Sequence, residues 1–219
     1  QSGAKSVGIT GTKGKTTTSS LLAATLKNAG IDVRLCGNIG LPMLDTLEGI
    51  TKNTVFVVEL SSFQLAELSQ SPDVAIITNL FRDHTDYHGN LEEYWEAKHN
   101  IMKHMDESGT VIFNPEFEVI LHWLAESPAK QLQIDPQENV DMTKAKLIGD
   151  HNKLNFLMVR AAAELFGVDR MSIANTLHSF EPVRHRLQPV RTVNGITYVD
   201  DAIGSNPEAT TAGIKALIY

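Results

Sequence analysis

Residues 8–18 read Gly-Ile-Thr-Gly-Thr-Lys-Gly-Lys-Thr-Thr-Thr, and the segments on either side decide what this stretch is. The preceding run Ser6–Thr10 predicts a buried strand, and the following segment Thr16–Ala29 carries leucines at helical spacing. A glycine-rich turn between a strand and a helix leaves backbone N–H groups available at the positive end of the helix dipole. The stretch therefore predicts a phosphate-binding loop, and it indicates a nucleoside triphosphate as the ligand.

The loop departs from the standard phosphate-binding pattern at one position. That pattern has glycine six residues before its lysine, where this chain has Ile9. We interpret the loop as a variant in which Gly11 and Gly14 let the backbone approach phosphate. Lys15 then reaches the outer phosphates, and the hydroxyl of Thr16 binds Mg²⁺. The alternative, a turn that binds nothing, is disfavoured because Gly-Lys-Thr at a strand–helix junction is a fairly specific signal.

Composition limits the class of protein. The chain has 219 residues, 42% of them hydrophobic and 21% charged, which is typical of a globular domain with a sizeable core. The net charge is −7 and no long basic run is present, which argues against nucleic acid or an acidic membrane as a partner. Cys36 is the single cysteine, so a disulfide framework is excluded. With no apolar stretch of membrane-spanning length and no signal peptide, we expect a cytoplasmic enzyme.

Predicted strands and helices alternate along most of the chain. Besides the two already named, strands are predicted at Asp32–Gly37, Thr54–Leu60, Val74–Leu80, Gly109–Asn114 and Gln131–Ile134, and helices at Leu91–Met105, Phe117–Ala125, His151–Gly167, Arg170–Phe180 and Pro207–Leu217. This alternation predicts an α/β fold with a mostly parallel sheet flanked by helices, which binds ligands at the carboxyl ends of its strands. Asn194-Gly195 predicts a small antiparallel hairpin near the C-terminus, between strands Gln188–Val193 and Ile196–Val199.

Two polar residues at predicted strand ends are candidate metal ligands. Glu59 follows four apolar strand residues, and burying an unpaired carboxylate there would be costly. Beside a phosphate-binding loop, it suits a second Mg²⁺ ligand. The alternative is a solvated glutamate at a strand end. His84 lies in the polar loop after the next strand and can also ligate a metal, although a loop histidine is more often simply exposed.

Lys98 interrupts the apolar face of the predicted helix 91–105. That face consists of Leu91, Tyr94, Trp95, Ile101, Met102 and Met105. A buried ammonium costs several kcal/mol unless it is paired or neutralised, and desolvation favours the neutral amine. One outcome is reaction with CO₂ to a carbamate, which is an anionic metal ligand. The alternative is an amine that reaches water past the apolar face, and periodicity alone favours it.

Polar residues in the C-terminal third are weaker candidates. Asn152 and Asn155 lie on one helix face and can hydrogen-bond a purine or a phosphate, although helix capping is the favoured role without other evidence. Arg186 can clamp phosphate oxygens. The carboxylates of Asp200 and Asp201 can hold a ribose or a metal.

Together these motifs resemble the Mur ligase family, ATP-dependent enzymes that add amino acids to the peptidoglycan precursor. In chain order they are Gly11-Thr-Lys-Gly-Lys-Thr16, Gly37-Asn-Ile-Gly-Leu-Pro42, Glu59-Leu-Ser-Ser-Phe-Gln64, Asp83-His84, Ala97-Lys98, Gly149-Asp-His-Asn152, His185-Arg186 and Asn206-Pro-Glu208. The resemblance covers nearly the whole chain. The second and third motifs look like those of the glutamate-adding branch.

The resemblance implies roles for individual residues. ATP would contact Gly11, Thr12, Lys13, Gly14, Lys15, Thr16, Thr17, Asn155, Arg186 and Asp201. Two Mg²⁺ ions would be held by Thr16, Glu59, His84 and Lys98, the last as its carbamate. Lys15, Glu59, His84 and Lys98 would be catalytic, and Asn38, Ser61 and Ser62 would bind the substrate. The fold implied is the P-loop type of the family's central domain.

The resemblance also implies the reaction. The carboxylate of UDP-N-acetylmuramoyl-L-alanine would attack the γ-phosphate of ATP, and the amine of glutamate would attack the resulting acyl phosphate. These small molecules are the expected partners, and the enzyme is expected to be a monomer. The chain departs from the family pattern at two positions: Lys13 stands where many relatives have asparagine, and Ile203 stands where many glutamate-adding relatives have lysine. The second departure leaves D- versus L-glutamate open, because some relatives with an apolar residue there add glutamate of the other stereochemistry.

The extent of the chain gives a further expectation. Family ligases have three domains, yet here the loop begins at residue 8 and only 13 residues follow Asn206. We expect residues 1–219 to be a single ATP-binding central domain, without the UDP-binding and amino-acid-binding domains, that does not complete ligation. Two rival hypotheses are a folylpolyglutamate synthase-type ligase, which shares the ATPase core, and a non-catalytic nucleotide-binding module.

Overall fold

A computed structural model describes residues 3–83, 88–185, 187–202 and 207–218. Its main sheet has six strands in the order β2-β3-β1-β4-β5-β6, and every neighbouring pair is parallel. The strands are β1 (Lys5–Thr10), β2 (Asp32–Gly37), β3 (Thr54–Glu59), β4 (Val74–Ile77), β5 (Thr110–Phe113) and β6 (Lys130–Gln133). The α/β fold with a mostly parallel sheet is therefore confirmed.

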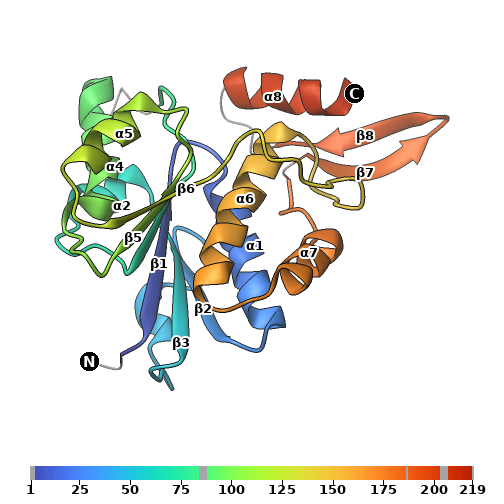
Figure 1. Ribbon diagram of the computed structural model, residues 1–219. Helices are drawn as coiled ribbons and strands as arrows, with labels where there is room; N and C mark the ends of the chain where they lie inside the picture. The colour runs from blue at the N-terminus through green and yellow to red at the C-terminus, as the bar shows by residue number, and fades with distance from the viewer. Residues whose placement is uncertain (1–2, 84–87, 186, 203–206, 219) are drawn as a thin grey trace.

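Helices cover both faces of this sheet (Figure 1). One face packs against α1 (Lys15–Asn28), α6 (Asp150–Leu165) and α7 (Arg170–Ser179), and the other against α2 (Ser62–Ala66), α4 (Leu91–Lys103) and α5 (Glu118–Ala125). Alternate strand residues enter the two cores: Ile76 belongs to the first, and Ala75 and Ile77 to the second. Because both faces are buried, the strands are almost continuously apolar.

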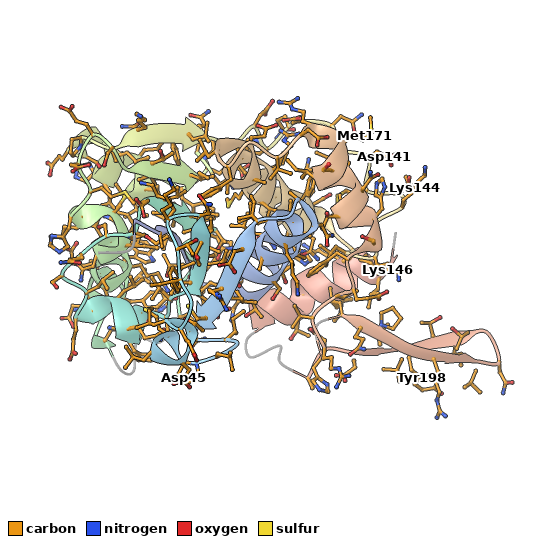
Figure 2. The ribbon with its side chains drawn as sticks, turned by 90° about the horizontal axis from the view of Figure 1, so that it is seen from below. Asp45, Asp141, Lys144, Lys146, Met171 and Tyr198 are labelled. Atoms are coloured by element: carbon orange, nitrogen blue, oxygen red, sulfur yellow. The ribbon has the colours of Figure 1, made fainter. Side chains whose placement is uncertain are left out.

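The C-terminal part departs from the layered body. Strands β7 (Gln188–Val193) and β8 (Ile196–Asp200) form the predicted antiparallel hairpin, with Asn194 at φ 52° and Gly195 at φ 79° in its turn. Figure 2 shows this hairpin projecting from the body and carrying Tyr198. Helix α8 (Pro207–Ile218) packs near the start of α6, where Ala216 lies beside Gly149.

Local sequence signals explain where several helices begin. Asn90 accepts a hydrogen bond from the backbone of Glu93 at the start of α4, and Asp169 does the same for Ser172 at the start of α7. Ser61 and Gln64 form a capping box that starts α2. Sequence analysis missed the five-residue α2 and the short 3₁₀ helix η1 (Met43–Thr46) because neither is long enough to carry a periodic pattern. Among the described residues, no helix has the length and apolar character required to cross a membrane.

Replacing Ile76 with alanine should lower the free energy of unfolding by about 3 kcal/mol. Its side chain is fully buried in one of the two central strands, so the substitution leaves a cavity between the sheet and the α1–α6 layer. Urea denaturation followed by circular dichroism measures the change. Leu44→Ala is the control, since that side chain is 79% exposed and should change stability by less than about 0.5 kcal/mol. Equal effects of the two substitutions would contradict the assigned core.

Candidate active site

Polar residues gather where β3, β1 and β4 end. These strands are adjacent and run in the same direction, so their carboxyl ends meet at one edge of the sheet, the upper edge in Figure 1. The loop 11–14 follows β1, Glu59 ends β3, and Asn79 lies just beyond β4. The topology therefore brings together segments that are far apart in the sequence.

Glycine is required at both ends of the loop. Gly11 has φ +145°, and a Cβ atom there would lie 1.9 Å from Thr78 Oγ1. Gly14 has φ +83°, and a Cβ there would lie 2.5 Å from Asn155 Oδ1. Gly14 is also the N-cap of α1 and provides no side-chain cap, so the loop backbone itself forms the end of the helix. This cradle fits a phosphate group, which such helix ends bind through N–H groups and the helix dipole.

Two lysine side chains meet at one loop carbonyl. Lys15 Nζ donates to the Gly11 carbonyl at 3.0 Å and to the Thr12 carbonyl at 3.1 Å. Lys98 Nζ donates to the same Gly11 carbonyl, also at 3.0 Å. A third lysine of this region, Lys13, forms an ion pair with Asp83 at 3.3 Å. The loop is thus lined by three lysine side chains although the chain as a whole is acidic.

Lys98 is buried, contrary to the interpretation that periodicity alone favoured. Its side chain comes from α4, is only 1% exposed, and places Nζ 4.7 Å from the centre of the Tyr94 ring. The amine does not reach water past the apolar face, because the end of the side chain turns inward to the loop. Burial lowers the pKa of Lys98 well below its usual 10.5, the positive charge of Lys15 lowers it further, and Asp83 partly opposes both.

The buried amine should make the protein less stable at neutral pH than an apolar substitute would. Above pH 10.5 the amine is neutral in both the folded and unfolded chain. As the pH falls, the unfolded chain takes up the proton first, so stability is lost until the pH reaches the depressed pKa of the folded state. In CO₂-free buffer, where Lys98 stays an unmodified amine, we expect Lys98→Met to unfold at a higher urea concentration than wild type at pH 7, with the difference in urea midpoint narrowing as the pH rises.

The control for that measurement is Lys103→Met. Lys103 lies on the same helix, but it is half exposed and pairs with Glu96 at 2.6 Å. Its replacement should not stabilise the protein. A Lys98→Met variant that is less stable than wild type across the whole pH range would contradict the account.

Glu59 is also buried rather than solvated. It is 1% exposed, Oε1 accepts from Asn38 Nδ2 at 3.0 Å, and Oε2 lies 3.5 Å from Ser19 Oγ. Gly37 permits this contact: a Cβ there would lie 2.2 Å from the Glu59 carbonyl oxygen, to which the Asn38 backbone donates at 2.9 Å. A buried carboxylate near the hydroxyl groups of α1 supplies the hard oxygen ligand that Mg²⁺ prefers. Within residues 3–83, 88–185, 187–202 and 207–218, no group of three or more His, Cys, Asp or Glu side chains could hold a metal.

The two serines that the sequence predicts to bind substrate have different environments. Ser61 is partly exposed and bonds Gln64 in the capping box of α2. Ser62 is buried, and its hydroxyl lies 2.9 Å from His88 Nε2. The His88 ring in turn stacks on Phe63 at 5.4 Å. The geometry leaves Ser61 nearer to solvent than Ser62.

The asparagines of α6 do not act as helix caps. Gly149 is the N-cap of α6, and Asn155 lies within the helix, buried against Gly14. Asn155 Nδ2 donates to Asn152 Oδ1 at 3.2 Å, and Asn152 donates to the Ile148 carbonyl. The capping interpretation is therefore wrong for Asn155, whose amide lies beside Gly14 in the loop 11–14.

Of the remaining predicted site residues, the structure describes Asp200 and Asp201 at the end of the hairpin. Asp201 Oδ1 accepts from the backbone N–H of Leu187 at 3.2 Å, and its neighbour Asp200 accepts from His185 Nδ1 at 2.7 Å. These contacts tie the end of the hairpin to the segment before it. His84 and Arg186 lie outside the described residues.

Residues 9–177 match the model of the Mur ligase middle domain. The chain belongs to this family. Sequence relatives named UDP-N-acetylmuramoylalanine–D-glutamate ligase include those of Clostridium kluyveri, 37% identical over 97% of this chain, and Streptococcus mutans, 37% identical over 95%. The chain spans about half the length of the curated relatives it matches, 50% and 51% in these two cases.

Solved structures agree with the fold of a Mur ligase middle domain. MurF ligase from Thermotoga maritima, in complex with ADP, superposes with a TM-score of 0.78 at 22% identity, over 98% of this chain and 57% of that one. MurF from Acinetobacter baumannii gives a TM-score of 0.75 at 20% identity, over 99% of this chain and 54% of that one. At these identities the likeness concerns the fold alone.

Sequence analysis missed two contributors to the site of this Mur ligase domain. Tyr94 was assigned only to an apolar face, yet its hydroxyl donates to Thr12 Oγ1 at 3.2 Å, and burial raises its pKa to about 12, so the phenol keeps its proton. Asn79 contacts the backbone of Lys13 across 66 positions of sequence. A polar residue directly after an apolar strand was the available signal for Asn79, and the tyrosine had no local signal.

Proposed function

We propose that this chain is the ATP- and Mg²⁺-binding part of a ligase that joins glutamate to UDP-N-acetylmuramoyl-L-alanine. The observation that carries the proposal is the meeting of Lys15 and the buried Lys98 at the Gly11 carbonyl. A structural turn has no need of two amines at one carbonyl, whereas a site for Mg²⁺ and a triphosphate needs a cation such as Lys15 for the phosphates and an amine that can be converted to an anionic metal ligand, which Lys98 supplies. Family membership and the names of the relatives support the same reading.

Residue roles follow from this proposal. The ATP contacts we propose are Gly11, Thr12, Lys13, Gly14, Lys15, Thr16, Thr17, Asn155, Arg186 and Asp201. Mg²⁺ would be held by Thr16, Glu59, His84 and the carbamate of Lys98, and when bound it neutralises phosphate charge. Substrate contacts would involve Asn38, Ser61 and Ser62, of which Asn38 also orients the Glu59 carboxylate.

We propose that Lys98 reacts with CO₂. Its neutral amine nitrogen bonds to the carbon of CO₂ while one C=O π bond opens onto oxygen, and the nitrogen then loses one proton to water, so that the neutral amine becomes an anionic carbamate. Three features support the step: burial, the depressed pKa and the adjacent positive charge of Lys15. The carbamate would pair with the surrounding cations, which the ammonium repels.

The protein contributes positioning and charge neutralisation to the reaction. Lys15 and the N-terminus of α1 stabilise negative charge on the phosphoryl oxygens while the substrate carboxylate attacks the γ-phosphate. This step gives an acyl phosphate and ADP. The glutamate amine then attacks the acyl carbon, and phosphate leaves. The names of the two relatives, both D-glutamate ligases, favour D-glutamate over L-glutamate.

We further propose that residues 1–219 act as a single central domain of a three-domain, monomeric and cytoplasmic ligase, with no nucleic-acid or membrane partner. The chain spans only half of its relative's length, which supports the proposal that it is one domain of a larger ligase. The net charge of −7 supports the absence of a nucleic-acid partner. On this proposal the chain binds Mg-ATP but does not complete ligation by itself.

An ADP-release assay tests the function. The longer protein that contains this chain should release ADP with UDP-N-acetylmuramoyl-L-alanine and D-glutamate, and much more slowly with L-glutamate. The 219-residue chain alone should release little. Release driven by a folate and glutamate instead would favour a folylpolyglutamate synthase. Folded protein that neither binds Mg-ATP nor releases ADP would favour a non-catalytic module.

A further inference from the structure

The side chain of Asn79 both accepts a hydrogen bond from the backbone of the loop 11–14 and donates one to it. Its side-chain Oδ1 accepts from the Lys13 N–H at 2.8 Å, and its Nδ2 donates to the Lys13 carbonyl at 2.9 Å. The Asn79 backbone carbonyl also accepts from the Thr12 N–H at 2.9 Å. Thr78 Oγ1 donates to the same Lys13 carbonyl at 2.6 Å. Both acceptor positions of that carbonyl are therefore used by the end of β4.

These contacts reverse one peptide group of the loop relative to the two before it. In the peptides Gly11–Thr12 and Thr12–Lys13, the carbonyl oxygens accept hydrogen bonds from lysine amines. The N–H groups of these two peptides, on Thr12 and Lys13, donate to Asn79. At the following peptide it is the Lys13 carbonyl that points to Asn79. The described residues contain no cis peptide, and in a trans peptide the C=O and N–H point in opposite directions. The Gly14 N–H therefore points away from Asn79, as the Thr12 carbonyl does.

The reversal matters for an anion. The Thr12 carbonyl faces Lys15, so the Gly14 N–H is directed to the side of the loop where the lysine amines lie. If the Lys13–Gly14 peptide turned over, a carbonyl oxygen would take the place of that N–H and would repel a phosphate. We propose that Asn79 is a positioning residue for the nucleotide: its amide fixes this peptide so that the Gly14 N–H faces the phosphate. The inference rests on the proposed function.

Only an amide can make both contacts. An amide offers an acceptor oxygen and a donor nitrogen, whereas a carboxylate offers two acceptors. Asn79→Asp keeps the size of the side chain but sets a negatively charged oxygen against the Lys13 carbonyl. It should therefore destabilise the observed orientation of the peptide while leaving the packing around β4 nearly unchanged.

Calorimetric titration with Mg-ADP tests the proposal on the 219-residue protein. We expect Asn79→Asp to raise the Kd for ADP about tenfold or more. Thr78→Val, which removes the second donor to the Lys13 carbonyl, should raise it about threefold. Asn114→Ala is the matched control, because Asn114 is a buried asparagine that directly follows the adjacent strand β5 and bonds Glu116 in its own loop. This control can lower stability but should leave the ADP affinity unchanged.

Amide resonances provide a readout that a merely structural role would not move. In wild type, ADP should shift the Gly14 N–H resonance and the Lys13 N–H should exchange slowly with solvent. In Asn79→Asp, both effects should diminish at temperatures where the variant is fully folded. Wild-type affinity and an unchanged Gly14 shift in folded Asn79→Asp would overturn the inference. If that variant does not fold, unchanged affinity in Thr78→Val overturns it. Wild-type protein that binds no ADP would instead refute the proposed function.

Discussion

Lys98→Ala should lower turnover of the longer ligase that we propose about 100- to 1,000-fold. The substitution removes the side chain that reaches from α4 to the Gly11 carbonyl, and with it the anionic carbamate that we propose. Because the phosphate-binding loop keeps Lys15, the affinity for ADP should change far less than turnover. Initial rates of ADP release and calorimetry with Mg-ADP measure the two quantities.

Chemical rescue separates loss of the carbamate from loss of a packed side chain. Acetate or formate can enter the space left by Lys98→Ala and supply an anionic oxygen, so we expect partial recovery of turnover. Wild-type turnover should fall in CO₂-free buffer and return with bicarbonate. Lys103→Ala, on the exposed side of the same helix, should gain nothing from acetate or formate and should respond to CO₂ removal and bicarbonate as wild type does. An absence of rescue together with CO₂-independent wild-type turnover would refute the carbamate.

Gly11→Ala should raise the Kd for ADP about 100-fold or more. The new Cβ would lie 1.9 Å from Thr78 Oγ1 and 3.1 Å from both the backbone N and O of Asn79. Thr78 cannot simply rotate away, because its hydroxyl donates to the Lys13 carbonyl at 2.6 Å and also lies 3.2 Å from the Thr10 carbonyl. The loop itself must move, which also displaces the carbonyl that receives Lys15 and Lys98.

A second glycine controls for backbone strain. Gly30 has φ +82° at the end of α1, and a Cβ there would meet no atom within 4 Å. Gly30→Ala should therefore cost only about 1 kcal/mol of stability and leave ADP affinity unchanged. Calorimetry with Mg-ADP and thermal unfolding of both variants separate the steric clash at Gly11 from the backbone strain that alanine would have at either position. Wild-type ADP affinity in Gly11→Ala would show that the loop is not the nucleotide site.

The local hydrophobic pattern of the sequence predicted most of the fold, because each parallel strand and each covering helix has a recognisable pattern within its own short segment. The strand Asp32–Gly37 has the predicted bounds, and the predicted strand Val74–Leu80 ends earlier, at Ile77, where Thr78 and Asn79 turn to the loop. The strand order could not be predicted, since each strand has the same continuous apolar character. Elements as short as α2 are set by a capping box and by tertiary contacts, not by periodicity.

The candidate site was predicted less evenly. Glycine and lysine at a strand–helix junction have a local signature, so the loop was found from sequence. The direction of the Lys98 side chain was not predicted by periodicity. Periodicity places a residue on a helix face, but it does not say whether the end of its side chain turns inward. The contacts of Asn79 to Lys13 and of Tyr94 to Thr12 depend on how distant segments meet at the sheet edge.

A crystal structure of this chain with Mg²⁺ and a non-hydrolysable ATP analogue, grown with bicarbonate present, tests the central claim most directly. The account predicts phosphate oxygens on the Gly14 N–H and Lys15 Nζ, a cation bound by the Thr16 hydroxyl and the Glu59 carboxylate, and a carboxylate added to Lys98 Nζ. Nucleotide bound elsewhere, or an unmodified Lys98 still donating to the Gly11 carbonyl beside a bound triphosphate, would contradict it.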